Sequence, residues 1–202
     1  MNRILSQVSA SALKVAVVAS SPSERSRSRA GARHAARFLR EHGVQTELID
    51  LRRTPVPLYD PGAPADPQRD ELVRLFNDAD AWVLSAPVYN WGTCSHLTNF
   101  LHFALDHGGR RYRPFVLVAG AGSQQSLLAF DGTGRTLLHE VYGVQVGPAV
   151  LLAADAVDRE TDSLGDDVRP RLEQALTALI HFGAASARLF APAAAELVAA
   201  GT

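Results

Sequence analysis

Five consecutive residues, Ala86-Pro87-Val88-Tyr89-Asn90, have the types needed to hold a flat heteroaromatic ring. They follow the apolar run 81–85 and precede a helical pattern. Open α/β sheets bind ligands at the carboxyl ends of their strands, which is where a rigid proline turn would place these residues. Tyr89 and Trp91 offer apolar faces, while Asn90 and main-chain N–H groups offer polar contacts. Such a ledge suits a planar ring with a polar edge, and a flavin is the first candidate.

A second group of polar residues lies in Ser20–Ser28, after the apolar run Lys14–Ala19 and before a helical pattern. The N-terminus of a helix attracts anions, and hydroxyl and guanidinium groups can bond phosphate oxygens. Neither the glycine-rich dinucleotide motif nor the Walker A motif is present. The loop is therefore expected to bind a mononucleotide phosphate through hydroxyls. The alternative is a solvated loop with an ordinary serine cap.

A third segment, Ala119–Gln125, follows another apolar run and contains two glycines that allow close approach of a ligand to the main chain. A plain tight turn is equally compatible with this composition. The convergence of three such loops on one sheet edge favours a binding site. The residues expected to hold the cofactor are Ser21, Ser26, Arg27, Ser28, Pro87, Val88, Tyr89, Asn90, Trp91, Gly120, Ala121, Gly122, Ser123 and Gln124.

Strand and helix patterns alternate along the chain, which predicts parallel βαβ units. Five strands are expected at 14–19, 44–50, 80–85, 113–119 and 144–152. Helices are expected at 29–42, 67–78, 95–107, 126–142 and 169–190. This pattern predicts an α/β three-layer sandwich of the flavodoxin-like type, with a five-stranded parallel sheet in the order 2-1-3-4-5. Residues 14–190 form the expected domain, between a lead-in at 1–13 and an alanine-rich tail at 191–202.

The composition of the chain narrows the range of possible binding partners. The net charge of −1 gives no electrostatic basis for binding nucleic acid or an anionic membrane. No segment approaches the roughly 18 apolar residues of a membrane span. The single cysteine, Cys94, excludes an internal disulfide and a cysteine-based zinc site, which suits a reducing cytoplasm. His102 and Asp106 lie four residues apart, but two ligands do not make a metal site.

The motifs resemble those of the NADPH-dependent FMN reductase family. Pro87-Val88-Tyr89-Asn90 matches the P-x-Y-N motif of that family, and Ser21 and Ser26 occupy serine positions of its G-S-x-R-x-x-S motif. The chain is most similar to flavin reductases of two-component monooxygenases, through Ala19–Pro22, Ser26–Ser28, Pro87–Tyr89 and Leu127–Asp131. The resemblance covers about residues 14–190. Ser20, Ser23, Ser95, His96, Thr98 and Ala121 depart from the family pattern.

The resemblance implies FMN as cofactor and NADPH or NADH as hydride donor. Hydride can pass directly between the two rings, so no catalytic side chain is expected. Reduced flavin would serve a flavin-dependent monooxygenase. The alternatives are an FMN-bound quinone or azo reductase, a one-electron carrier and a non-catalytic flavodoxin-like protein. The helix at 95–107 has an apolar face wider than one stripe, and related reductases pack this region against another subunit, so a homodimer or homotetramer is expected.

Overall fold

The computed structural model describes residues 13–106, 111–122, 130–158 and 161–199, with side chains up to residue 190. Its main sheet has the strand order β2-β1-β3-β5-β6, and all of these neighbours are parallel. The strands are β1 (Lys14–Ala19), β2 (Gln45–Asp50), β3 (Ala81–Tyr89), β5 (Pro114–Gly120) and β6 (Val144–Gln145). The predicted order 2-1-3-4-5 and the flavodoxin-like fold are therefore confirmed.

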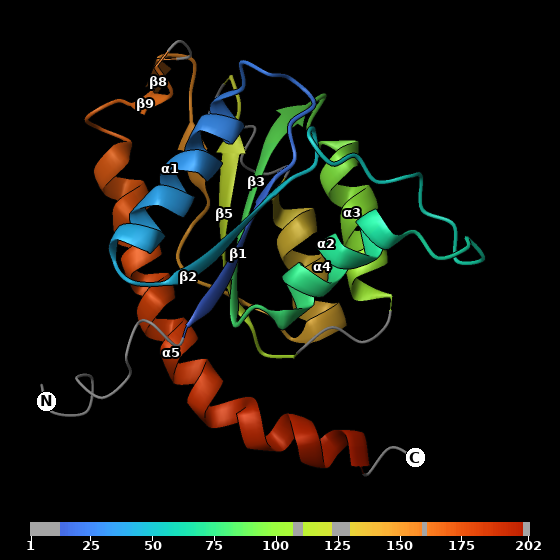
Figure 1. Ribbon diagram of the computed structural model, residues 1–202. Coiled ribbons are helices and arrows are strands. Elements are labelled where there is room, and N and C mark those ends of the chain that lie inside the picture. The colour runs from blue at the N-terminus through green and yellow to red at the C-terminus, as the bar shows by residue number, and fades with distance from the viewer. Residues whose placement is uncertain (1–12, 107–110, 123–129, 159–160, 200–202) are drawn as a thin grey trace, which may run out of the picture.

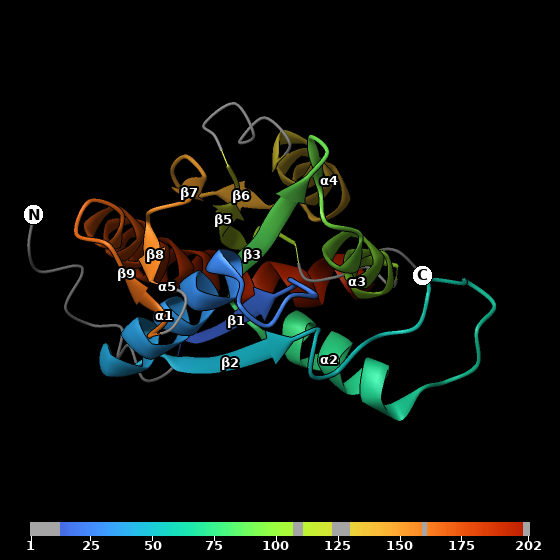
Figure 2. The ribbon, with the colours of Figure 1, turned by 90° about the horizontal axis from the view of Figure 1, so that it is seen from above.

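Helices cover both faces of this sheet (Figures 1 and 2). One layer holds α1 (Arg27–Glu41) and α5 (Arg169–Ala199). The other holds α2 (Pro67–Asp78), α3 (Ser95–Leu105) and α4 (Asp131–Val141). None of the helices in the described part of the chain has both the length and the hydropathy that a bilayer span requires.

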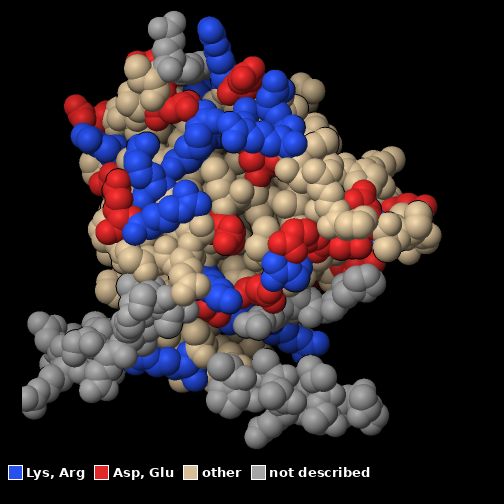
Figure 3. Space-filling view, viewed as in Figure 1, with Lys and Arg blue, Asp and Glu red and all other residues tan. Residues whose placement is uncertain are grey.

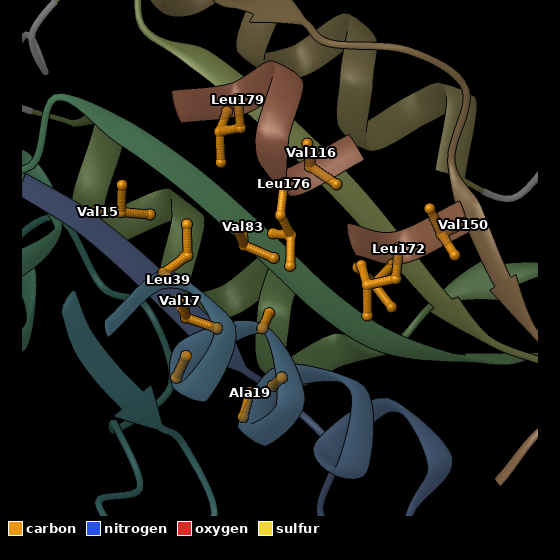
Figure 4. Packing of buried hydrophobic residues seen from close by; sticks show 14 of the residues in the cluster. Val15, Val17, Ala19, Leu39, Val83, Val116, Val150, Leu172, Leu176 and Leu179 are labelled. Carbon is orange, nitrogen blue, oxygen red and sulfur yellow. The ribbon is translucent and has the colours of Figure 1, made fainter. Parts of the chain in front are cut away.

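The two helical layers explain why the central strands are apolar on both faces. In β1, Val15 and Val17 join the cluster beneath α1 and α5, whereas Ala16 and Val18 join the cluster beneath α2, α3 and α4. Figure 4 shows the first cluster, in which Leu172 and Leu176 of α5 pack towards the sheet. A parallel strand buried on both sides needs continuous rather than alternating hydrophobicity, and the sequence of β1 meets that need.

The third strand is longer than predicted. We expected it to end at Ser85 and Pro87 to form a turn, but β3 continues to Tyr89, and Pro87 pairs with Gly120 of β5. Pairing with β1 ends at Ala19 and Ser85. Beyond that point β3 has lost its β1 neighbour, and a residue without an N–H group is tolerated at such an edge. The chain reverses only after Tyr89, into the short strand β4 (Gly92–Thr93).

The predicted fifth strand is divided in two. In place of one strand over 144–152, the structure has β6 at the beginning of that range and β7 (Val150–Leu152) at its end. Both pair with β5. Gly147 has a φ of 73° and is followed by Pro148, so the intervening segment cannot continue a regular strand. The structure also has a small antiparallel hairpin that we did not predict, formed by β8 (Val157–Asp158) and β9 (Ser163–Leu164).

Helix boundaries differ from the predictions at several points. α1 begins two residues early, so Arg27 and Ser28 belong to its first turn rather than to the preceding loop. α3 ends at Leu105, short of His107, and α5 continues past Phe190 to Ala199. The described part of α4 begins at Asp131, and residues 126–129 of the predicted helix lie outside the described residues.

The wide apolar face of α3 is covered within the chain. Leu97, Phe100, Leu101, Phe103 and Ala104 are all buried. The connection between β2 and α2 supplies part of the cover, because the ring of Tyr59 lies edge-on to Phe103 and stacks on His102. The face we had assigned to a partner subunit therefore has an intramolecular explanation.

Candidate functional site

Three segments meet at the carboxyl edge of the sheet, around Ser28. The Ser85 hydroxyl of β3 donates to the Ser28 carbonyl oxygen at 2.7 Å. A Cβ atom at Gly120 of β5 would lie 3.0 Å from the Ser28 nitrogen and 3.2 Å from its Cβ. That approach is tighter than most Cβ contacts in proteins, so glycine lets β5 reach the first turn of α1 without displacing Ser28. The predicted convergence of these segments is thus present in the structure.

The N-terminus of α1 is suited to an anion. Its N-cap, Ser26, makes no capping hydrogen bond through its side chain, and its Oγ lies 2.9 Å from the Oγ of Ser28 instead. The first turn contains no acidic residue. The first main-chain hydrogen bond of the helix runs from the Ala30 N–H to the carbonyl oxygen of Ser26. The earlier N–H groups have no partner within the helix, which is the usual condition for phosphate binding.

An ion pair that sequence reasoning missed positions the first loop. The buried Arg29 guanidinium contacts the Asp50 carboxylate at 2.5 Å and donates to the carbonyl oxygens of Ser23 and Glu24 at 3.5 and 3.4 Å. Arg29 therefore links the loop to the end of β2. The available signal was an aspartate at the carboxyl end of the second strand and an arginine in the first turn of the preceding helix, although the sequence does not pair them.

Ser21 and Ser20 face the interior. Ser21 Oγ accepts a hydrogen bond from the Ser23 N–H at 3.2 Å. Ser20, which replaces a glycine of the family motif, is fully buried. Its hydroxyl donates to the carbonyl oxygen of Ser85 at 3.0 Å and lies 3.2 Å from Cys94 Sγ. Burial raises the pKa of the Cys94 thiol. Cys94 therefore has the character of a packing residue rather than a nucleophile.

The aromatic ledge is the end of a tight hairpin. Asn90 and Trp91 have φ values of 50° and 62°, in the left-handed region that a two-residue turn of this kind requires. Asparagine tolerates this region, but tryptophan rarely adopts it, so the turn carries backbone strain. Trp91 is 66% exposed and Tyr89 is 49% exposed. Both rings are thus presented to solvent at the site edge, whereas Val88 is half-buried.

The third predicted segment is only partly described. Gly120 and Ala121 are buried, and the Ala121 N–H donates to the Leu152 oxygen at 3.2 Å, which fixes the end of β5. Gly122 is exposed, and a Cβ there would meet nothing within 4 Å. The predicted contacts Ser123 and Gln124 lie outside the described residues.

The largest hollow that we describe, about 560 Å³, lies elsewhere, between α3 and α4. Thr93, Thr98 and Thr133 line it, together with Tyr59, but none of the predicted cofactor residues does. The hydroxyls of Thr93 and Thr133 lie 2.9 Å apart and connect the hairpin to α4. We place the candidate site at the sheet edge because the N–H donors that suit a phosphate and the exposed aromatic rings are there.

Comparison with known proteins decides the family. The model of the NADPH-dependent FMN reductase family matches residues 13–158. The chain belongs to this family. That match makes it a flavin reductase, an oxidoreductase that uses FMN. A comparison with curated protein sequences finds no match.

Solved structures show the same fold. An NADH:FMN oxidoreductase, EMOB in its apo form, is 22% identical with a TM-score of 0.65, over 85% of this chain and 88% of that one. FerB, a flavoenzyme NAD(P)H:(acceptor) oxidoreductase from Paracoccus denitrificans, is 18% identical with a TM-score of 0.70, over 85% and 97%. An FMN-dependent NADH-azoreductase from Bacillus anthracis, in complex with FMN, is 13% identical with a TM-score of 0.59, over 83% and 99%.

The residues present fit an FMN group. The uncapped first turn of α1 in this flavin reductase suits the phosphate, and Gly120 lets the end of β5 pack closely against that turn at Ser28. The strained hairpin supplies apolar rings beside the sheet edge. These features suit two chemical parts of the cofactor, the phosphate and the ring face.

Proposed function

We propose that the flavin reductase holds FMN at the sheet edge and oxidises NADPH or NADH there. The observation that carries this proposal is the meeting of Ser85, Ser28 and Gly120 at an uncapped helix N-terminus. Main-chain donors of α1, with Arg27, bind the phosphate. The segment Pro87–Trp91 lines the ring, and Gly120–Gln124 contacts its polar edge.

The proposed hydride transfer requires no catalytic side chain. FMN, when bound, would supply the acceptor for a hydride from the nicotinamide ring, and that transfer would need no proton donor from the protein. The chain binds and orients the two rings and excludes water from between them. The raised pKa of buried Cys94 and the interior bonds of Ser20 agree with a site that has no nucleophile.

Free FMN is the proposed second substrate, and its reduced form would supply a flavin-dependent monooxygenase. The similarity of Ser26-Arg27-Ser28 and Pro87-Val88-Tyr89 to the reductases of two-component systems supports this choice. A quinone or azo acceptor is the alternative, because EMOB and the azoreductase share the fold while differing in the acceptors that their names state. Assembly as a homodimer or homotetramer is part of the same proposal, and it is supported by the resemblance to related reductases alone, because the apolar face of α3 is covered within the chain.

A steady-state assay tests the proposal. The purified protein with catalytic FMN should oxidise NADPH or NADH at 340 nm, and free FMN in excess should sustain turnover under anaerobic conditions. A quinone or an azo dye in place of excess FMN distinguishes the acceptors. Failure to oxidise either nucleotide with any of these acceptors would contradict the proposal and favour a carrier or a non-catalytic protein.

Tryptophan fluorescence tests where the ring lies. FMN should quench the exposed Trp91, so Trp91→Ala should remove most of the quenching. Trp82 provides an internal control, because it is buried, stacks on Phe76 at 4.5 Å and donates its indole N–H to the Phe76 oxygen at 2.9 Å. Quenching of equal size in Trp91→Ala would move the ring away from the hairpin.

A further inference from the structure

A second polar hollow lies on the outer flank of the α1 N-terminus. It measures about 520 Å³, within the range of roughly 300–1,000 Å³ typical of small-molecule sites. Its walls are the first loop, the start of α1, the segment that follows β2 and the β8–β9 hairpin. We call it the arginine hollow, because it is lined by Arg25, Arg29, Arg33, Arg52 and Arg53.

Positive charge is in excess in this hollow. Its carboxylates are Glu24 and Asp162, with Asp50 behind Arg29. Asp162 pairs with Arg33, and Glu24 lies 3.5 Å from Arg52. Five guanidinium groups thus face three carboxylates. Figure 3 shows Lys and Arg side chains gathered over the upper part of the molecule, where α1 begins.

Two of the arginines are available to a ligand. No ion pair or hydrogen bond of the exposed Arg25 is found among the described residues. The Arg53 side chain is 82% exposed, and its only acidic contact in the described part of the chain is a long one, 3.9 Å from Asp50. Asp50 is already engaged at 2.5 Å by Arg29. Arg25 and Arg53 can therefore turn to an anion without breaking a strong ion pair.

The arginine hollow is separate from the proposed flavin site, although both use the start of α1. Gly31 marks the sheet side of this helix, since a Cβ there would meet Leu152 and Val118. Arg29 and Arg33 form a stripe on another side, where they contact Asp50 and Asp162. None of the residues predicted to hold the flavin lines the hollow.

We propose that the arginine hollow binds the 2′-phosphate of NADPH. This inference rests on the proposed function, which places the nicotinamide at the flavin ring, and the hollow adjoins the same start of α1 as the proposed flavin site. Guanidinium groups pair with phosphate in a two-pronged geometry, so several arginines around one hollow suit a doubly charged phosphate monoester. NADPH differs from NADH by that group alone. The hollow would make the enzyme selective for NADPH.

The double variant Arg25→Ala/Arg53→Ala tests the assignment. Its KM for NADPH should rise about tenfold, a modest change because both side chains are exposed. Its KM for NADH and its affinity for FMN should not change. Arg74→Ala is the matched control, since Arg74 is an exposed arginine on α2 that pairs with Glu71 and Asp78, and it should alter neither KM. An equal rise for both nucleotides, or no rise, would overturn the proposal.

The same variant separates the two possible phosphates. If its affinity for FMN falls while that for riboflavin is kept, the hollow holds the flavin phosphate, and the proposal is wrong. Calorimetry with 2′,5′-ADP and AMP gives an answer that needs no turnover. Wild-type protein should bind 2′,5′-ADP more tightly, and the double variant should lose that difference. Equal wild-type affinities would refute the site even if the reductase is active, whereas a difference would support it even if the proposed function fails.

Discussion

The N-termini of α1 and α2 are built in opposite ways. Asp66 caps α2 by accepting hydrogen bonds from the N–H groups of Gln68 and Arg69, both at 3.0 Å, and Pro67 and Asp70 complete its first turn. Ser26, at the corresponding position of α1, makes no capping hydrogen bond through its side chain, and the first turn of α1 contains no acidic residue. Helix ends normally find such partners within the chain. The proposed phosphate site requires this difference: α2 uses its first N–H groups for stability, while those of α1 would serve a ligand.

Removing the cation at the start of α1 should have the largest effect. We expect Arg27→Ala to weaken FMN binding by about 1.5–3 kcal/mol, the cost of one charge-assisted hydrogen bond. Riboflavin, which has no phosphate, should bind the variant almost as well as the wild type. Fluorescence titration with both flavins gives the two affinities. Arg37→Ala, an exposed arginine farther along α1, serves as the control and should leave both affinities unchanged.

Equal losses for FMN and riboflavin in Arg27→Ala would contradict the comparison between the two helices. The phosphate would then lie elsewhere, and the uncapped end of α1 would have no ligand to explain it.

Replacing the N-cap residues, Ser26 of α1 and Asp66 of α2, should have a smaller effect. We expect that effect on the stability of the fold rather than on flavin binding. Asp66→Ala should lower the free energy of unfolding by about 1 kcal/mol, because two main-chain donors lose their acceptor. Ser26→Ala should cost less, since its hydroxyl accepts no main-chain N–H of the helix. Urea unfolding of both variants without flavin measures the difference. A Ser26→Ala cost as large as that of Asp66→Ala would mean that α1 is capped after all.

Much of the fold could be predicted because the local signals agree. β1 and α2 have the predicted boundaries, Lys14–Ala19 and Pro67–Asp78. A compact β-branched run marks the first, and a proline at the first helical position marks the second. β3 was predicted too short because Pro87 usually ends a strand. The proline is tolerated within β3 because the pairing of β3 with β1 ends two residues earlier, at Ser85. That end point is a property of the sheet rather than of the local sequence.

The candidate site was predictable in outline only. Parallel topology brings the loops after β1, β3 and β5 together, and the contacts of Ser28 confirm that meeting. The roles of individual side chains depend on contacts between distant segments. Arg29 pairs with Asp50, and Arg33 pairs with Asp162 of an unpredicted hairpin. No spacing in the sequence encodes either pair.

The unequal lengths of β1 and β3 have a consequence for the entropy of binding. β3 continues to Tyr89, beyond its last pairing with β1 at Ser85, so the wall of the proposed ring site is sheet rather than loop. Its main chain is ordered by pairing with β5 and β4 when the protein folds. A ligand that arrives there need not fix that backbone again, and the corresponding entropic penalty is absent from its binding free energy. Affinity at this edge can therefore come from few contacts.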